Sequence, residues 1–191
     1  MKQLLLIDSC VSTHRPSRTM ALCEAFLEQF QGHWDIGSIV LERAGLYPLT
    51  QSALARRDRH VADQDFSSPE FDLARQVAAA DGIVVAAPHW DLSFPSLLKL
   101  FIEHIMVSGL TFRYPDRGPV GLCRAERLTY ITTAGGFLPE PDWAYGYVAA
   151  IAAMLGIGRT DCLSAQGLDI EGNDVAAIMA AAEARARALI W

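Results

Sequence analysis

The stretch Ala86-Ala87-Pro88-His89-Trp90-Asp91-Leu92-Ser93-Phe94-Pro95 decides how this chain folds. It begins within an apolar run, Ile83–Ala87, which ends at Pro88, and a run with helical spacing follows it. A short β-branched run between breakers is typical of a buried parallel strand, and ligands of open α/β sheets bind beyond the carboxyl ends of such strands. The loop at 88–92 therefore suits a planar aromatic ligand, although an ordinary strand–helix loop with buried aromatic side chains has the same pattern.

The order of the apolar runs predicts one α/β domain over residues 1–191. Five runs are expected to form strands: Leu4–Asp8, Ile36–Leu41, Ile83–Ala87, Leu128–Thr132 and, less apolar, Thr160–Ala165. Segments with helical spacing lie between these runs, at Thr19–Phe30, Phe71–Ala80, Leu97–Met106 and Tyr145–Leu155. A last helix, which Asn173 or Asp174 could cap, is expected to end near Leu189. Strands that alternate with helices imply a parallel sheet with helices on both faces, and this length favours a three-layer, doubly wound flavodoxin-like fold with strand order 2-1-3-4-5.

One segment does not belong to this alternating pattern. Leu46–Ser68 is long and polar, and a short helix is expected in it from Gln51 to about Asp63. Insertions of this length often form part of a site wall or of a subunit contact.

The composition narrows the class of protein. With 51% hydrophobic and 20% charged residues, the chain is expected to be compact and globular. Its net charge of −6 argues against nucleic acids and anionic membranes as partners. No apolar stretch could span a bilayer, the start of the chain lacks the features of a signal peptide, and Cys10, Cys23, Cys123 and Cys162 lack metal-ligand spacing. The sequence therefore predicts a cytoplasmic protein with reduced thiols and no metal.

The loop after the first strand is rich in hydroxyl groups and ends where a helix begins. Free N–H groups and the helix dipole favour a phosphate at that point, and Ser17 and Thr19 could add hydroxyl donors. Simple N-capping by Ser17 is the alternative. The loop contains no glycine, so it matches neither the P-loop nor the dinucleotide-binding fingerprint.

The loop after the fourth strand, Thr132–Phe137, contains Gly135 and Gly136. Two glycines would let the backbone approach a flat ligand and direct N–H groups at it, although a tight turn without a ligand is the alternative. All three loops are expected at the same edge of one sheet. Together they suit a ligand with a phosphate at one end and a planar ring at the other, which is the shape of flavin mononucleotide (FMN).

Several motifs resemble the flavodoxin-like NAD(P)H:quinone oxidoreductase superfamily, and most closely its FMN-dependent NADH-azoreductase branch. The matching motifs, which extend the resemblance over nearly the whole chain, are Ala87-Pro88-His89-Trp90-Asp91, Leu97-Leu98-Lys99, Gly109-Leu110-Thr111-Phe112-Arg113-Tyr114, Gly118-Pro119-Val120-Gly121-Leu122 and Thr133-Ala134-Gly135-Gly136. The resemblance implies a homodimer with FMN sites at the subunit boundary. It also implies NADH or NADPH as co-substrate and quinone, azo or nitro compounds as small-molecule acceptors.

The resemblance further implies a set of FMN-binding residues. Those expected at the phosphate are Ser17, Arg18 and Thr19, with Ser9 or Cys10 nearby. Those expected at the ring edge and ribityl chain are Pro88, His89, Trp90, Asp91 and Leu92. Those expected at the pyrimidine side are Thr133, Ala134, Gly135 and Gly136.

The cofactor would carry the chemistry, so no catalytic side chain is required, although His89 could donate a proton to the acceptor. Trp90, Trp143 and Phe137 could enclose a planar substrate, with core packing as the alternative for Trp143. Ala134 stands where the family often has Arg, which keeps open a flavin-binding regulatory protein without turnover. A flavodoxin-like electron carrier is the other alternative, although the usual Thr-rich phosphate loop of such carriers is missing.

Overall fold

The computed structural model describes residues 1–11 and 16–191, so Ser12, Thr13, His14 and Arg15 of the predicted first loop lie outside the described residues. A five-stranded parallel sheet has the order β2-β1-β3-β6-β7. The strands are β1 (Lys2–Asp8), β2 (Trp34–Val40), β3 (Gly82–Ala86), β6 (Arg127–Thr133) and β7 (Arg159–Ala165). The predicted order 2-1-3-4-5 describes the same topology, because β6 and β7 are the predicted fourth and fifth strands.

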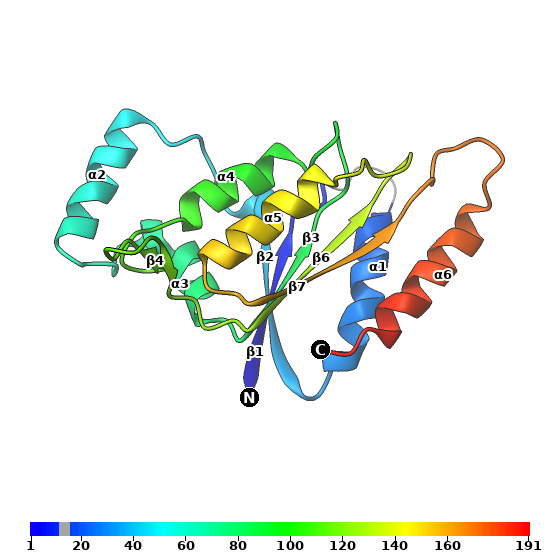
Figure 1. Ribbon diagram of the computed structural model, residues 1–191, viewed down its shortest axis with the longest axis horizontal. Helices are drawn as coiled ribbons and strands as arrows, with labels where there is room; N and C mark the ends of the chain where they lie inside the picture. Colours follow the sequence, from blue (N-terminus) through cyan, green and yellow to red (C-terminus); the bar gives the residue numbers. More distant parts are fainter. Residues whose placement is uncertain (12–15) are drawn as a thin grey trace.

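The helices lie on both faces of this sheet (Figure 1). The α-helices are α1 (Arg18–Leu27), α2 (Gln51–Ala62), α3 (Asp72–Ala79), α4 (Ser96–Ile105), α5 (Trp143–Met154) and α6 (Val175–Ala188). Single 3₁₀ turns occupy η1 (Glu28–Phe30), η2 (Leu41–Arg43) and η3 (Pro69–Phe71). The predicted first helix therefore ends as a 3₁₀ turn, and Asp174 caps α6 by accepting from Ala177 N at 3.0 Å.

Two hydrophobic clusters fill the spaces between sheet and helices. On one face, Ile83 and Tyr130 pack with Phe71 and Phe101 beneath α3, α4 and α5. On the other face, Phe26 and the rest of its cluster lie beneath α1 and α6. All five residues of β3 are buried, because this strand lies in the middle of the sheet. The helix α2 lies to one side of the layers (Figure 1).

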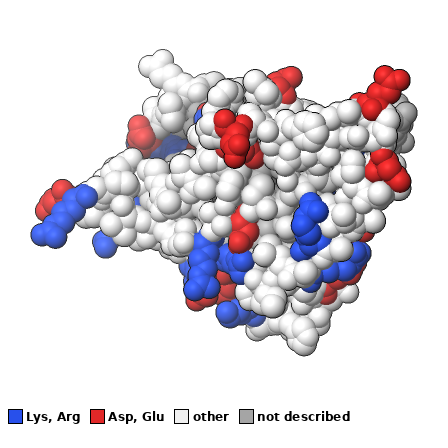
Figure 2. Space-filling model, turned by 45° about the vertical axis from the view of Figure 1, so that its right-hand side comes forward, with Lys and Arg blue, Asp and Glu red and all other residues white. Residues whose placement is uncertain are grey.

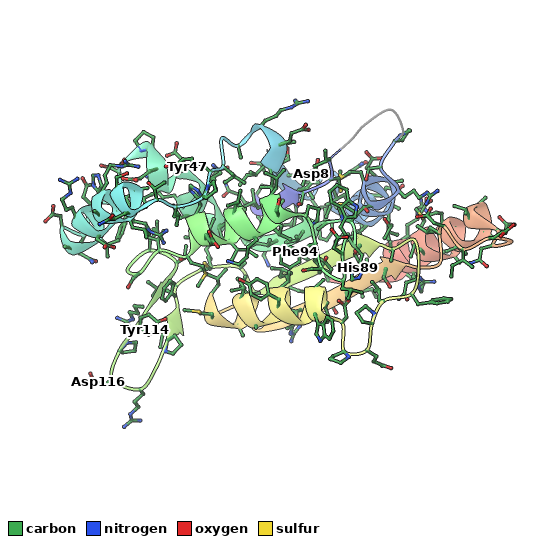
Figure 3. The ribbon with its side chains drawn as sticks, turned by 90° about the horizontal axis from the view of Figure 1, so that it is seen from above. Asp8, Tyr47, His89, Phe94, Tyr114 and Asp116 are labelled. Carbon is green, nitrogen blue, oxygen red and sulfur yellow. The ribbon has the colours of Figure 1, made fainter. Side chains whose placement is uncertain are left out.

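A short hairpin lies outside the predicted elements. Its strands β4 (Phe112–Arg113) and β5 (Val120–Gly121) pair antiparallel, and Tyr114 and Asp116 lie on the loop between them, which projects from the body (Figure 3). Gly121 is required there, because a Cβ would lie 2.0 Å from the carbonyl carbon of Leu155. The hairpin base is thus pressed against the end of α5.

The end of the chain is fastened to the amino edge of the sheet. The Trp191 ring makes edge-on contacts with Phe30, Phe26 and Trp34 at centroid distances of 5.0, 5.9 and 5.9 Å. Its Nε1 donates to Thr129 Oγ1 at 2.7 Å. Among the helices of the described residues, none is both long and apolar enough to cross a membrane.

Candidate functional site

The carboxyl ends of β1, β3 and β6 bring the three predicted loops together. Backbone hydrogen bonds continue beyond the strands, from Ser9 N to Ala86 O and from His89 N to Thr133 O, both at 2.9 Å. Seen from above, Asp8 and His89 lie in the middle of the molecule, where these strands end (Figure 3). The predicted convergence of the loops is therefore present in the structure.

The first loop ends at the start of α1, where Ser17 is the N-cap and its Oγ accepts from Met20 N at 3.2 Å. The N–H groups of Arg18 and Thr19 have no acceptor among the described residues. The Thr19 side chain is buried and shares a 2.6 Å hydrogen bond with Thr133 Oγ1. Thr19 thus joins the first loop to the third with its hydroxyl, and its N–H is left for an anion.

Ser9 and Cys10 are both buried at the end of β1. Cys10 N donates to Asp8 Oδ1 at 2.8 Å, and its Sγ lies 3.6 Å from Ala86 O. Burial raises the pKa of the Cys10 thiol to about 12, with a smaller contribution from the Asp8 carboxylate. The thiol is therefore neutral at physiological pH and is a weak nucleophile.

The second loop contains a strained turn that the sequence did not predict. Trp90 N donates to Ser93 O at 3.0 Å and Ser93 N donates to Trp90 O at 2.8 Å. Between them Asp91 and Leu92 have φ values of 50° and 62°, the pattern of a type I′ turn. Glycine or asparagine usually occupies such positions, so the conformation is costly for Leu92. The N–H groups of Asp91 and Leu92 donate to no described acceptor.

The third loop directs its carbonyl groups away from the site. The carbonyls of Ala134, Gly135 and Gly136 accept from Leu168 N, Asp169 N and Gly167 N at 3.2, 2.9 and 2.7 Å. The N–H groups of Gly135 and Gly136 donate to nothing among the described residues. The third loop thus offers two free donors.

The two glycines of the third loop differ in what surrounds them. Neither has a positive φ, and at Gly136 a Cβ would meet nothing within 4 Å. A Cβ at Gly135 would lie 2.3 Å from Asp169 Oδ2. The small residue at 135 therefore accommodates a carboxylate of the same chain on the side where a Cβ would lie.

Buried polar atoms without partners collect at the same place. Six buried side-chain polar atoms of the described residues lack a hydrogen-bond partner, and five of them belong to Ser9, His89, Tyr130 and Thr132. The strand register places Ser9 and Thr132 on either side of Ala87. Burial raises the pKa of the Tyr130 phenol, which therefore remains protonated. Because buried polar groups are normally hydrogen-bonded, this cluster offers polar partners to a ligand that reaches it.

Exposed aromatic rings surround these loops. Trp90 is 45% exposed, Trp143 is 57% exposed and Phe137 is 75% exposed. Core packing is thereby excluded for Trp143. Acidic residues predominate along the upper edge of the face in Figure 2, and basic residues along the lower part. The rim of the site is consequently apolar and acidic.

Arg18 and Asp169 form a link that the sequence analysis missed. Arg18 Nη1 lies 2.9 Å from Asp169 Oδ1 and 3.3 Å from Leu168 O. The guanidinium predicted at a phosphate thus pairs with a carboxylate 151 residues away. The available signal was the position of Gly167-Leu168-Asp169 after β7, at the same sheet edge.

Other parts of the described chain have fewer features of a binding site. Among its residues, no group of three or more His, Cys, Asp or Glu could hold a metal ion. A hollow of about 750 Å³ lies at the opposite edge of the sheet, beside Phe30, Trp34 and Trp191. We place the site at the carboxyl edge because the unpartnered polar groups are there.

The observed donors fit the phosphate and ring of FMN. Free N–H groups at the start of α1 suit the phosphate. Those of the second and third loops suit the oxygen and nitrogen atoms along the ring edge. The unpartnered side chains of Ser9, Thr132 and His89 add polar contacts. The fold and this site define a flavodoxin-like protein with a place for an anionic, ring-bearing ligand.

Comparisons with known proteins agree with this class. A family model described as "flavodoxin-like fold" matches residues 2–190. FMN-dependent NADH:quinone oxidoreductase 2 of Clostridium acetobutylicum is 34% identical over 189 residues, which cover 94% of this chain and 93% of that protein. FMN-dependent NADH:quinone oxidoreductase of Caldicellulosiruptor bescii is also 34% identical over 189 residues, with the same coverage of 94% and 93%.

Solved structures show the same fold at lower identity. An azoreductase from Bacillus anthracis superposes with a TM-score of 0.84 over 98% of both chains, at 20% identity. An FMN-dependent NADH-azoreductase from Bacillus anthracis, in complex with FMN, superposes with a TM-score of 0.80 over 98% of this chain and 97% of that one, at 21% identity. The chain belongs to the flavodoxin-like NAD(P)H:quinone oxidoreductase superfamily, which includes these quinone reductases and azoreductases.

Proposed function

We propose that this protein is an FMN-dependent oxidoreductase that uses NADH, or NADPH, to reduce quinone, azo or nitroaromatic compounds by two electrons. The observation that carries the proposal is the set of unpartnered donors on three loops at one sheet edge. The curated relatives that are 34% identical are named FMN-dependent NADH:quinone oxidoreductases, which supports the same reaction here. We further propose that residues 1–191 form a single domain.

The proposed binding residues have distinct roles. At the phosphate, α1 presents the N–H groups of Arg18 and Thr19. At the ring edge, the turn presents the N–H groups of Asp91 and Leu92, and the third loop presents those of Gly135 and Gly136. The other proposed contacts are Ser9, Cys10, Ser17, Pro88, His89, Trp90, Thr133 and Ala134.

FMN held by these residues would supply two-electron hydride chemistry between the nicotinamide and the acceptor. The protein must hold the ring and stabilise the negative charge that reduction adds to it. Fixed backbone N–H groups do this well, because they need no reorientation when charge develops. We propose the N–H groups of Gly135 and Gly136 for that task, because they donate to nothing among the described residues. A quinone also needs a proton from solvent, and His89 is the side chain of the second loop that could deliver it.

The cofactor and the reaction can be tested on the purified protein. We expect a yellow protein that releases FMN on heating and whose flavin absorbance bleaches when NADH is added without oxygen. Addition of a quinone should then restore the yellow colour. Release of FAD, or of no flavin after expression with ample flavin, would overturn the proposal. A flavin that NADH does not bleach would favour the electron-carrier alternative.

We also propose that the protein is a homodimer. Apolar side chains are exposed on α2 and on the hairpin, with Leu54 at 42% and Tyr114 at 67%. Leu54 lines a groove of about 400 Å³, in which apolar side chains such as Phe112 and Ile151 lie beside charged ones such as Lys99 and Glu103. Exposed apolar side chains gathered in this way favour a contact with another chain. A second copy of this chain would bury both features.

Sedimentation at micromolar concentration tests the dimer. We expect the wild-type protein to sediment as a dimer and Leu54→Glu to shift it towards monomer, because the charge would be buried in the contact. Ile190→Glu is the matched control, since Ile190 is 84% exposed and follows α6, away from α2. A monomeric wild type, or equal effects of both substitutions, would rule out this interface.

A further inference from the structure

Asp169 connects two parts of the proposed FMN site. Its Oδ1 accepts from Arg18 Nη1 at 2.9 Å, at the start of α1. Its backbone N donates to Gly135 O at 2.9 Å, and its Oδ2 lies 2.3 Å from where a Cβ of Gly135 would be. The same carboxylate therefore contacts the phosphate end of the site and the loop proposed for the pyrimidine side of the ring.

We propose that Asp169 is a positioning residue that joins Arg18 to the third loop and lowers the reduction potential of bound FMN. This inference rests on the proposed function, because it concerns the proposed cofactor at the proposed site. It assigns a role to an acidic residue outside the motifs that identified the site. It also explains why position 135 is glycine although its φ is not positive.

Electrostatics gives the direction of the effect. Reduction adds negative charge to the flavin ring, and a carboxylate beside Gly135 opposes that charge. Arg18 offsets part of this repulsion, and solvent weakens what remains, because the side chains of Arg18 and Asp169 are 41% and 70% exposed. Asp169 should therefore weaken the binding of reduced FMN more than that of oxidised FMN. The effect is expected to be modest.

The first test removes the charge and keeps the shape. We expect Asp169→Asn to raise the affinity for reduced FMN, relative to that for oxidised FMN, by about threefold to tenfold compared with wild type. A tenfold change corresponds to a midpoint potential about 30 mV higher for a two-electron couple. Glu171→Gln is the matched control, because Glu171 is an exposed acid two residues away and has no ion pair among the described residues. A spectroscopic redox titration with a reference dye measures the potential.

The second test examines the contact itself and needs no cofactor. In Gly135→Ala the new methyl group would force the exposed Asp169 carboxylate to turn away from Arg18, so we expect the unfolding equilibrium constant to rise about fivefold. In an Asp169→Ala background the same change should cost less than threefold, because the carboxylate is absent. Gly136→Ala is the control, since a Cβ there meets nothing within 4 Å. The cost of Gly136→Ala should be the same in the wild-type and Asp169→Ala backgrounds.

The outcomes distinguish the two proposals. If wild-type protein binds no FMN, the proposed function fails, and with it the role of Asp169 in setting a potential. If wild type binds FMN but Asp169→Asn has the same potential as wild type and Glu171→Gln, the inference is overturned while the function stands. Equal costs of Gly135→Ala in both backgrounds would contradict the contact on which the inference depends.

Discussion

At the scale of the residue, hydroxyl groups on β6 differ in whether they have a partner. Thr129 Oγ1 accepts from Trp191 Nε1, whereas Thr132 Oγ1 is buried without a partner. Both side chains are fully buried, so solvent cannot compensate at Thr132. An unpartnered buried hydroxyl costs about 1–3 kcal/mol. Such a cost points to a ligand contact that the protein alone does not make.

Thr132→Val should therefore stabilise the cofactor-free protein. We expect the free energy of unfolding to rise by about 1 kcal/mol, because the unpartnered hydroxyl is lost. The affinity for FMN should fall if the hydroxyl contacts the cofactor. Thr129→Val is the matched control, and it should lose about 1 kcal/mol, since it breaks the bond to Trp191. Urea unfolding measures the stability of both variants. Equal losses of stability would contradict the lack of a partner for the Thr132 hydroxyl.

Sequence reasoning located most of the candidate site at this scale but missed how its residues interact. Ser9, Ser17 and His89 could be selected because they follow strands or precede a helix. Asp169 could not be selected from local pattern, because its partner Arg18 lies 151 residues away. Thr132 was predicted as the last residue of a strand and the first of the third loop, and nothing in a sequence shows that a hydroxyl has no partner.

At the scale of the element, the turn Trp90–Ser93 is the most strained piece of backbone in the site. Asp91 and Leu92 both have positive φ values, 50° and 62°. A branched side chain in that region costs about 1–2 kcal/mol. Strain of this kind persists where the surrounding structure fixes the backbone, and it is common at binding sites. The turn is therefore held in a conformation that leaves its N–H groups free.

Leu92→Gly tests the strain. Leu92 is 57% exposed, so little burial is lost, and we expect the free energy of unfolding to rise by about 1 kcal/mol. The turn should also become more mobile, which weakens FMN binding. Ser93→Gly provides the comparison, because Ser93 has no positive φ and the change should destabilise. The strain argument would fail if both variants lost stability to the same extent.

The long elements were predictable and the short ones were not. Apolar runs such as Ile83–Ala87 predicted the strands to within about two residues, and the sheet order followed from their alternation with helices. The β4–β5 hairpin was missed because two-residue strands have no measurable periodicity. The turn at 90–93 was missed because Asp91-Leu92 contains neither of the residues, glycine and asparagine, that usually indicate a type I′ turn.

At the scale of the whole molecule, charge is distributed unevenly between the two edges of the sheet (Figure 2). The acidic residues that follow the carboxyl ends of the strands include Asp91, Glu140, Asp142, Asp169, Glu171 and Asp174. Arg18 is paired with one of them, so the part of the rim that the structure describes carries more acidic than basic groups. A substrate that carries additional negative charge meets repulsion as it approaches.

The acidic rim should select among substrates by charge. We expect kcat/KM to be higher for NADH than for NADPH, and higher for neutral quinones than for sulfonated azo dyes. Raising the ionic strength from about 10 mM to about 150 mM shortens the screening length from about 30 Å to about 8 Å. That change should raise kcat/KM for the more negative substrates and leave neutral quinones nearly unaffected. Salt responses that do not differ with substrate charge would rule out this selection.

The buried thiols should make the protein sensitive to alkali. Burial raises the pKa of Cys10, Cys23, Cys123 and Cys162 to about 12, whereas thiols of an unfolded chain titrate near about 8.5. Below about pH 8 both states keep these protons, so the thiols leave stability independent of pH. Above that range the unfolded chain releases protons that the folded protein retains, and stability falls as pH rises towards about 12.

Urea unfolding between about pH 7 and pH 10 measures this loss. Each thiol contributes a slope of at most about 1.4 kcal/mol per pH unit where only the unfolded state is ionised. Cys23→Ala should reduce the slope, because it removes one of the four groups. A slope that stays the same in this variant would contradict the contribution of the thiol.

The packing of the last residues also affects the tryptophan fluorescence of the protein. Trp90 and Trp143 are 45% and 57% exposed beside the carboxyl edge, while Trp34 and Trp191 pack against each other at the amino edge, 5.9 Å apart. Indole emission shifts to longer wavelength in water, so the two pairs emit in different parts of the spectrum. A ligand bound at the carboxyl edge should alter the long-wavelength part most, because Trp90 and Trp143 lie beside that edge, whereas release of the last residues should alter the short-wavelength part. A single emission spectrum thus reports on both ends of the sheet.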